Sequence, residues 1–199
     1  MSILCKQLRN DTPLGSDRLR EIAELVYNTD PYIYPAMFAS RDEALAMIPA
    51  MFAARDPMFS LENLYVAEDG GRILGLILWI KGPMAWDTRV YDACMAVAGR
   101  APSEHIGLVV REYFSAYRNQ ARDVISLINV CAAIPGQGIG SALLEAFLRD
   151  HPDPCELYVL ADNAAAIRLY ERAGFQVAER LTGFSVEQTK PDCLRMTRG

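Results

Sequence analysis

The chain has 199 residues, of which 51% are apolar and 23% are charged, and this composition is typical of one soluble globular domain. Its net charge of −5 and its isoelectric point near 5.1 argue against a nucleic-acid partner, which would normally require a basic surface stripe. The longest apolar stretch, Ile73–Ile80, is far too short to span a membrane, and the N-terminus lacks the apolar run of a signal peptide. We therefore expect a cytoplasmic protein.

The cysteines give no pattern of their own, because their number is odd and no CxxC spacing occurs. Neither a disulfide framework nor a structural zinc site is expected, and the thiols are interpreted as reduced and buried. His105 and His151 stand too far from any partner in the sequence to indicate a metal centre, so no metal is expected. The five cysteines are Cys5, Cys94, Cys131, Cys155 and Cys193.

The first quarter of the chain predicts a strand followed by two helices. The strand covers Leu4–Leu8, and Asp17 is expected to cap the first helix. Asp30–Pro35 interrupts the helical pattern, since a proline disfavours helix in the residue before it. Ser40 and Glu43 form a capping box for the second helix. The apolar face of the first helix consists of Leu19, Ile22, Ala23 and Val26.

The middle of the chain predicts a hairpin, a helical segment and a buried strand. Leu64–Glu68 and Arg72–Ile80 are the two strands of the hairpin, and Asp69–Gly71 is its tight turn. Residues 83–122 have a helical pattern, and Val124–Cys131, rich in Val and Ile, predicts a strand buried on both faces.

The last third alternates strands and helices around the glycine-rich turn Gly136–Gly140. No repeat or flexible linker is visible, so residues 1–199 are read as one domain with a mixed sheet and helices on both faces. After the turn we expect a helix with Leu143 and Phe147 on its buried face, a strand at Glu156–Leu160, a helix capped by Asn163 or Asp162 and ended by Gly174, and closing strands at Phe175–Glu179 and Cys193–Thr197.

The glycine turn has the character of an anion site. A helix start leaves backbone N–H groups unpaired and carries partial positive charge, and glycines let a phosphate approach that backbone closely. Two common phosphate-binding motifs fit badly. A P-loop needs a lysine after the glycines, and none follows here; a dinucleotide fingerprint needs glycine where Ser141 stands.

These residues resemble the GNAT superfamily of acetyl-CoA-dependent N-acetyltransferases. The family motif Arg/Gln-x-x-Gly-x-Gly/Ala is matched by Gly138 and Gly140, whereas Pro135 replaces its basic or amide residue. The family's second block, Asn-x-x-Ala-x-x-x-Tyr-x-x-x-Gly-Phe, is filled at every named position. Those positions are Asn163, Ala166, Tyr170, Gly174 and Phe175.

The resemblance covers roughly residues 63–82 and 124–197, and it implies the α/β acyl-CoA N-acyltransferase fold, with a mixed, mostly antiparallel sheet. The helical insert at 83–122, between the third and fourth strands, departs from the family. The implied activity is transfer of the acetyl group of acetyl-CoA to a primary amine of a small molecule or peptide by direct attack. The implied cofactor-binding residues are Val130, Ala132, Gln137, Gly138, Ile139, Gly140, Ser141 and Asn163.

In this family pantetheine lies in a wedge between two splayed parallel strands, here 124–131 and 156–160. Tyr170 would then donate a proton to the departing thiolate, unless it only packs beside its helical neighbours. Asn163 is a helix N-cap under either interpretation. Arg168 and Arg172 could meet adenosine phosphates, but a solvated face is the favoured interpretation.

No general base is identified, because the predicted strand after Asp123 contains no carboxylate and Asn129 cannot accept a proton. A water chain to Asp123, Asp30 or Glu104 is one route, although a solvated surface charge is the favoured interpretation of each of these acids. Covalent catalysis by Cys131 is disfavoured, since burial raises the pKa of a thiol.

An amine acceptor would fit an aromatic cluster between the first two helices, in a region that borders the acceptor groove in this family. The insert would either wall this site or form a dimer surface, which leaves a homodimer open. Two other functions remain as alternatives: an acyl-CoA-sensing domain without turnover and a nucleotide-binding α/β domain. The cluster consists of Tyr27, Asp30, Tyr32, Tyr34, Met37 and Phe38.

Overall fold

The computed structural model describes residues 3–53, 59–83, 96, 123–182 and 192–199. Its strands form one sheet in the order β1-β2-β3-β4-β5-β7-β6, in which only the β4–β5 pair is parallel. The predicted mixed, mostly antiparallel sheet is thereby confirmed. The strands are β1 (Leu4–Gln7), β2 (Leu64–Asp69), β3 (Arg72–Lys81), β4 (Ile125–Ala132), β5 (Cys155–Leu160), β6 (Gln176–Leu181) and β7 (Cys193–Arg198).

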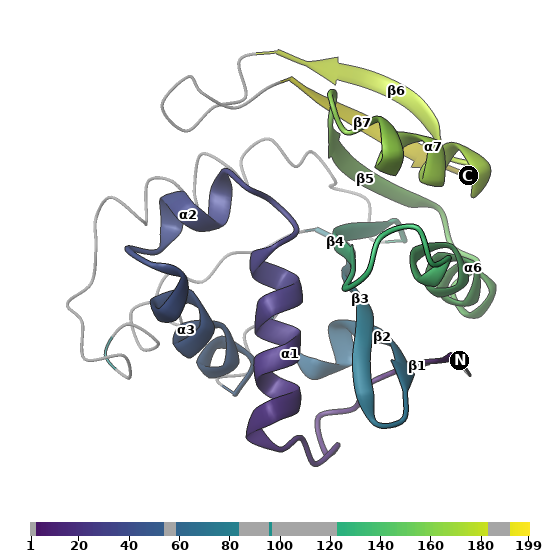
Figure 1. Cartoon of the computed structure of the whole chain (residues 1–199). Helices are drawn as coiled ribbons and strands as arrows, with labels where there is room; N and C mark the ends of the chain where they lie inside the picture. Colours follow the sequence, from purple (N-terminus) through teal and green to yellow (C-terminus); the bar gives the residue numbers. More distant parts are fainter. Residues whose placement is uncertain (1–2, 54–58, 84–95, 97–122, 183–191) are drawn as a thin grey trace.

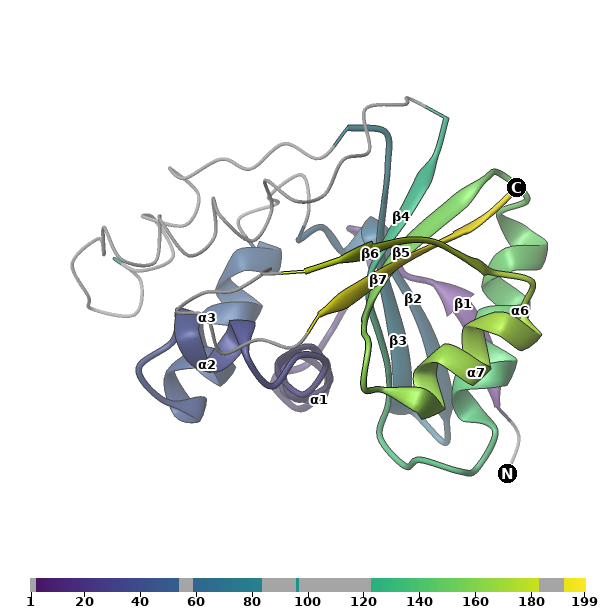
Figure 2. The same ribbon diagram turned by 90° about the horizontal axis from the view of Figure 1, so that it is seen from above.

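Helices cover both faces of the sheet, as Figures 1 and 2 show. One face carries α1 (Ser16–Tyr27), α2 (Ile33–Met37) and α3 (Arg41–Ala53), and the other carries α6 (Ile139–Asp150) and α7 (Ala164–Arg172). A short 3₁₀ turn, Leu61–Asn63, leads into β2. A separate hydrophobic cluster lies between the sheet and the helices on each of its faces, so the sheet is packed between two cores.

The start of the chain differs from expectation at two points. Asp17 does not cap α1; the N-cap is Gly15, and Asp17 lies in the first helical turn, where its charge still suits the helix dipole. Pro35 does not exclude helix, because α2 forms around it. Pro35 is the third residue of α2, and the N–H it lacks belongs to a first turn whose N–H groups have no intrahelical partner.

Local signals were accurate elsewhere. The Ser40 hydroxyl accepts the Glu43 N–H at 3.2 Å, so the predicted cap precedes α3. Gly70 and Gly71 adopt φ of 57° and 86°, the left-handed values that the tight β2–β3 turn requires.

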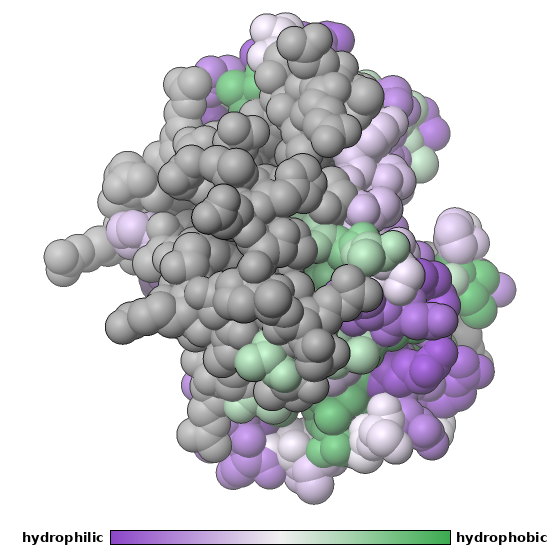
Figure 3. Space-filling view, turned by 90° about the vertical axis from the view of Figure 1, so that its left-hand side faces the viewer, coloured by the Kyte–Doolittle hydropathy of each residue, from purple (hydrophilic) through white to green (hydrophobic). Residues whose placement is uncertain are grey.

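Most of the predicted helical insert at 83–122, including Cys94, Glu104 and His105, lies outside the described residues. No described helix is both long and apolar enough to cross a membrane. On the face beside α2 and α3, the hydrophobic positions that are described are scattered among hydrophilic ones (Figure 3).

Candidate active site

The centre of the sheet opens between β4 and β5. Their pairing runs from Ile125 opposite Cys155 to Leu127 opposite Leu157 and ends there. At the next position β4 has a bulge: Leu78 and Trp79 of β3 pair with Asn129 and Leu127, which leaves Ile128 unpaired. A bulge bends its strand and increases its twist, so β4 departs from β5 beyond Leu127. The result is a wedge between the two strands that the family resemblance implied.

The free edge of β4 presents its backbone to this wedge. The Ala133 N–H donates to the Leu74 carbonyl of β3 at 2.7 Å. Because backbone groups alternate in direction along a strand, the N–H groups of Val130 and Ala132 point the opposite way, toward the open side. Both residues are only half-buried.

A cavity of about 90 Å³ occupies the wedge. It brings together three of the predicted site residues, Val130, Asn163 and Tyr170, with Thr29 and Asp30 from the corner between α1 and α2. Gln137, Ile139 and the glycines of the turn do not line this cavity. The cavity therefore connects the wedge with the region expected to take an acceptor.

Tyr170 lies against the cavity with only 7% of its surface exposed, and its ring packs on Phe175 at a centroid distance of 6.0 Å. Burial raises the pKa of the phenol, and the nearby Cys131 thiol raises it further. Among the described residues no side chain hydrogen-bonds to its hydroxyl. The phenol therefore keeps its proton at neutral pH and can donate it into the cavity.

Asn163 is the N-cap of α7, where its Oδ1 accepts the Ala166 N–H at 3.1 Å, so the predicted cap is confirmed. Asn163 also lines the cavity. Asp162, the alternative cap, does not serve this purpose.

The glycine turn exposes backbone at the start of α6. Gly138 is the N-cap with φ +75°, and a Cβ built there would meet no heavy atom within 4 Å. Gly136, at φ +80°, is equally open, whereas Ile139 is 1% exposed and anchors the turn in the core. Any contact of Ile139 with a ligand must therefore use its backbone. Open space beside left-handed glycines and a helix N-terminus is the arrangement that suits a phosphate.

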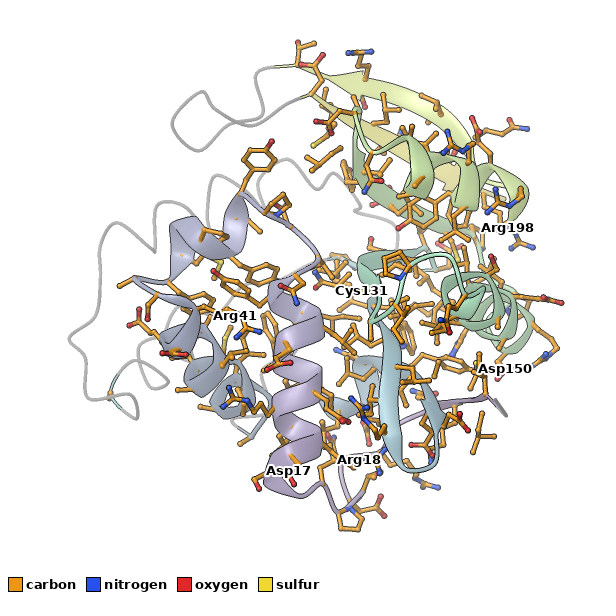
Figure 4. The ribbon with its side chains drawn as sticks, viewed as in Figure 1. Asp17, Arg18, Arg41, Cys131, Asp150 and Arg198 are labelled. Carbon is orange, nitrogen blue, oxygen red and sulfur yellow. The ribbon has the colours of Figure 1, made fainter. Side chains whose placement is uncertain are left out.

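A second depression, of about 380 Å³, runs between α6 and α7 and includes Ser141 at its start. Arg149, Arg172 and Arg198 line it above an apolar floor, and Glu145 is its one acid. Arg172 and Arg198 form no ion pair with any described residue. Figure 4 shows Arg198 beside α7, on the side of the molecule away from α1. The floor consists of Leu144, Leu148, Leu169 and Ala173.

A buried hydrogen-bond network joins β4 to the α1–α2 corner, and sequence reasoning missed it. The Tyr34 hydroxyl donates to Asn129 Oδ1 at 3.2 Å, and Asn129 Nδ2 donates to Thr29 Oγ1. The Thr29 hydroxyl in turn donates to the Val26 carbonyl at 2.6 Å. The Asn129 amide is thus engaged at both ends. The only sequence signal of this network was the presence of Asn129 in a mostly apolar strand.

Other titratable groups offer less chemistry. Burial raises the pKa of the Cys131 thiol to about 11, so its nucleophilic thiolate is scarce at neutral pH. Cys131 lies near the C-terminal end of β4, in the middle of the molecule as Figure 4 shows it. Asp123 is exposed before β4. Within the described ranges, no three His, Cys, Asp or Glu side chains come together as metal ligands would.

The fold is similar to solved N-acetyltransferase structures. An N-acetyltransferase from Staphylococcus aureus Mu50 is 18% identical with a TM-score of 0.66, over 98% of this chain and 99% of that chain. The NatC complex bound to Gag peptide and CoA is 17% identical with a TM-score of 0.59, over 100% of this chain and 98% of that chain. Arabidopsis thaliana Naa50, in complex with the bisubstrate analogue CoA-Ac-MVNAL, is 14% identical with a TM-score of 0.54, over 100% of this chain and 99% of that chain.

Sequence comparison adds the family. No curated protein matches the chain significantly by sequence. Residues 29–175 match the acetyltransferase (GNAT) family, a range that includes the wedge, the glycine turn and the whole of α7. With most of its length matched and its fold shared, the chain belongs to the GNAT acetyltransferase family.

Proposed function

We propose that this protein transfers the acetyl group of acetyl-CoA to a primary amine of a small molecule or peptide by direct attack. The observation that carries the proposal is the cavity that is lined both by the open β4 edge, at Val130, and by the protonated phenol of Tyr170. A thioester between them would have a backbone N–H on one side and a proton donor on the other.

The cosubstrate is proposed to follow the open elements in order. Pantetheine would lie in the wedge and pair with the N–H groups of Val130 and Ala132, as an added strand does. The pyrophosphate would rest on Gln137–Ser141, where the turn meets the N-terminus of α6. The arginine-lined depression begins at Ser141 and combines cations with an apolar floor, which suits a phosphorylated adenosine.

The chemistry follows from these positions. The amine nitrogen attacks the thioester carbonyl carbon, and the N–H of Val130 stabilises the oxyanion that forms. When the C–S bond breaks, the Tyr170 hydroxyl protonates the sulfur, and the phenolate then recovers the proton that the new amide nitrogen releases. The position of Tyr170 at the cavity supports this role, and the raised pKa of its phenol means that a phenolate formed there readily recovers a proton.

An amine acceptor is supported by the α1–α2 corner, where three aromatic rings pack together in the segment that contains Asp30. Tyr34 stacks with Phe38 at 6.5 Å and lies 6.3 Å from the ring of Tyr27. Two structural neighbours were solved with Gag peptide and with a bisubstrate analogue carrying the sequence MVNAL. A peptide N-terminus therefore belongs among the acceptors to test first.

The test is acetyl transfer from acetyl-CoA to a panel of amines: peptide N-termini, lysine peptides, amino acids, polyamines and aminoglycosides. Release of free CoA is followed with a thiol reagent, and the acetylated product is verified by mass spectrometry. Transfer to at least one amine supports the proposal. Tight CoA binding without transfer to any of them would contradict it and favour the sensing domain.

A further inference from the structure

The proposed attack needs a proton acceptor, and β4 does not provide one. An aliphatic amine has a pKa near 10, so it reaches the site as an ammonium and must lose a proton before it attacks. The one polar residue of β4 within the cavity lining is Asn129, whose amide takes up no proton and is held by Tyr34 and Thr29.

Asp30 lines the same cavity as Tyr170, and it is 9% exposed. Its Oδ1 accepts the backbone N–H groups of Tyr32 at 2.8 Å and of Ile33 at 3.0 Å. These bonds fix the carboxylate at the start of α2. Among the described residues that line the cavity, Asp30 is the only one with an acidic or basic side chain.

The same network that occupies Asn129 holds Asp30 in place from two sides. Thr29, the residue before it, is bonded to Asn129, and Tyr34, one helical turn after it, is bonded to the same amide. Burial raises the pKa of the Tyr34 phenol, and the negative charge of Asp30 raises it further. The α1–α2 corner is therefore anchored to β4 with its carboxylate at the cavity.

We propose that Asp30 binds the ammonium of the acceptor and takes its proton, directly or through a water in the cavity, so that the amine is released for attack. The role rests on the acetyl transfer proposed above. The ammonium N–H bond breaks and its proton joins an Asp30 oxygen. The proton passes to solvent after turnover, while the proton lost by the amide nitrogen reaches CoA through Tyr170. The acid absent from β4 is thus supplied by the α1–α2 corner.

Asp30→Asn isolates the charge, because the amide oxygen can still accept the two N–H groups that the carboxylate accepts. Asp123→Asn is the matched control, since Asp123 is exposed at the start of β4. Two isomeric amines distinguish a proton-accepting role of Asp30 from a structural one at pH 7.5: benzylamine, which is cationic, and 4-methylaniline, which is neutral. Each variant is checked first for an unchanged melting temperature and CoA affinity.

We expect Asp30→Asn to lower kcat/KM for benzylamine, or for the best alkylamine of the panel, about 100-fold, within the range of general base catalysis. Its kcat/KM for 4-methylaniline should stay within threefold of wild type, and Asp123→Asn should change neither. Equal losses for both probes would mean that Asp30 is structural, and no loss for either would also overturn the proposal. Absence of transfer to any amine by the wild type would refute the proposed function itself.

Equilibrium binding gives a second readout that needs no turnover. Calorimetry on the CoA-bound protein compares benzylamine with benzyl alcohol, which has the same ring but no charge. We expect Asp30→Asn to weaken benzylamine binding at least tenfold and to leave benzyl alcohol unchanged. Unchanged benzylamine affinity would show that Asp30 does not receive the cation.

Discussion

Alanine at Gly138 tests the anion site with the smallest change that can fill it. Gly138 has φ +75° and open space around its missing Cβ, so a methyl group there meets no clash and only backbone strain. Gly71, in the β2–β3 turn, has φ +86° and equally open surroundings. Alanine in the left-handed region strains the folded state, and it also lowers the conformational entropy of the unfolded chain, which partly offsets the strain. The net loss in the free energy of unfolding is about 1 kcal/mol for each variant. Gly71→Ala is therefore a matched control for stability.

The two variants should melt alike and bind CoA differently. A loss of about 1 kcal/mol lowers Tm by about 2–4 °C in a chain of this size. At Gly138 the methyl group stands where the backbone is proposed to approach the pyrophosphate. Loss of one charge-assisted hydrogen bond there costs about 1.5–3 kcal/mol, or about 10- to 150-fold in affinity.

Calorimetric titration with CoA, paired with thermal melts, measures both quantities on the same samples. Gly138→Asp should bind more weakly still, since it adds a negative charge beside the proposed phosphates. If folded Gly138→Ala binds CoA as tightly as Gly71→Ala does, the pyrophosphate does not rest on this turn.

Four further outcomes are expected. Tyr170→Phe should slow single-turnover acetyl transfer by about 10²- to 10⁴-fold at unchanged CoA affinity; a rate within threefold of wild type would assign Tyr170 to packing. Asn163→Ala removes the cap of α7 and should lower Tm by about 2–4 °C, from a loss of about 1 kcal/mol; an unchanged melt would contradict that role. Gly75→Ala would place a Cβ 2.8 Å from the Cys131 carbonyl oxygen. Its Tm should therefore fall further than the Tm of Gly71→Ala, whose new Cβ meets no atom within 4 Å. An equal fall in the two variants would show that β3 and β4 move apart at little cost. Burial raises the pKa values of Cys131 and Cys155 from 9.0 to about 11, so the folded chain holds more protons than the unfolded chain between these values. Stability present below pH 9 should therefore decline toward pH 11, and urea titrations at pH 8, 9 and 10 should show a smaller decline when both cysteines are replaced by serine.

Sequence predicted best what depends on near neighbours. The hairpin turn was predictable because two adjacent glycines meet the demand for positive φ at Gly70 and Gly71. The Asn163 cap and the glycine turn were predictable for the same reason, since each is decided within one helical turn. The Gly15 cap of α1 was missed because glycine, which bonds through no side chain, leaves a weaker signal than Asp17 does.

Long-range contacts were not predictable in the same way. Tyr34 and Asn129 are 95 positions apart, and no local pattern indicates that their side chains meet. Asp30 was therefore indistinguishable from a surface acid until the fold placed it beside the cavity with Tyr170. The helical conformation at Pro35 was missed because the general rule that proline disfavours helix does not apply within the first turn of a helix, where Pro35 lies.

The short contact between β4 and β5 has a consequence for how the molecule opens. In the described part of the chain, the ladder between the two halves of the sheet consists of three residue pairs, from Ile125 and Cys155 to Leu127 and Leu157. A junction of this size is a natural boundary between cooperative unfolding units, so the strand ends beside it should exchange their amide hydrogens before the hairpin of β2 and β3 does. A molecule that bonds to both sides of the junction acts as the missing length of sheet, and it stabilises the closed form in proportion to the logarithm of its concentration.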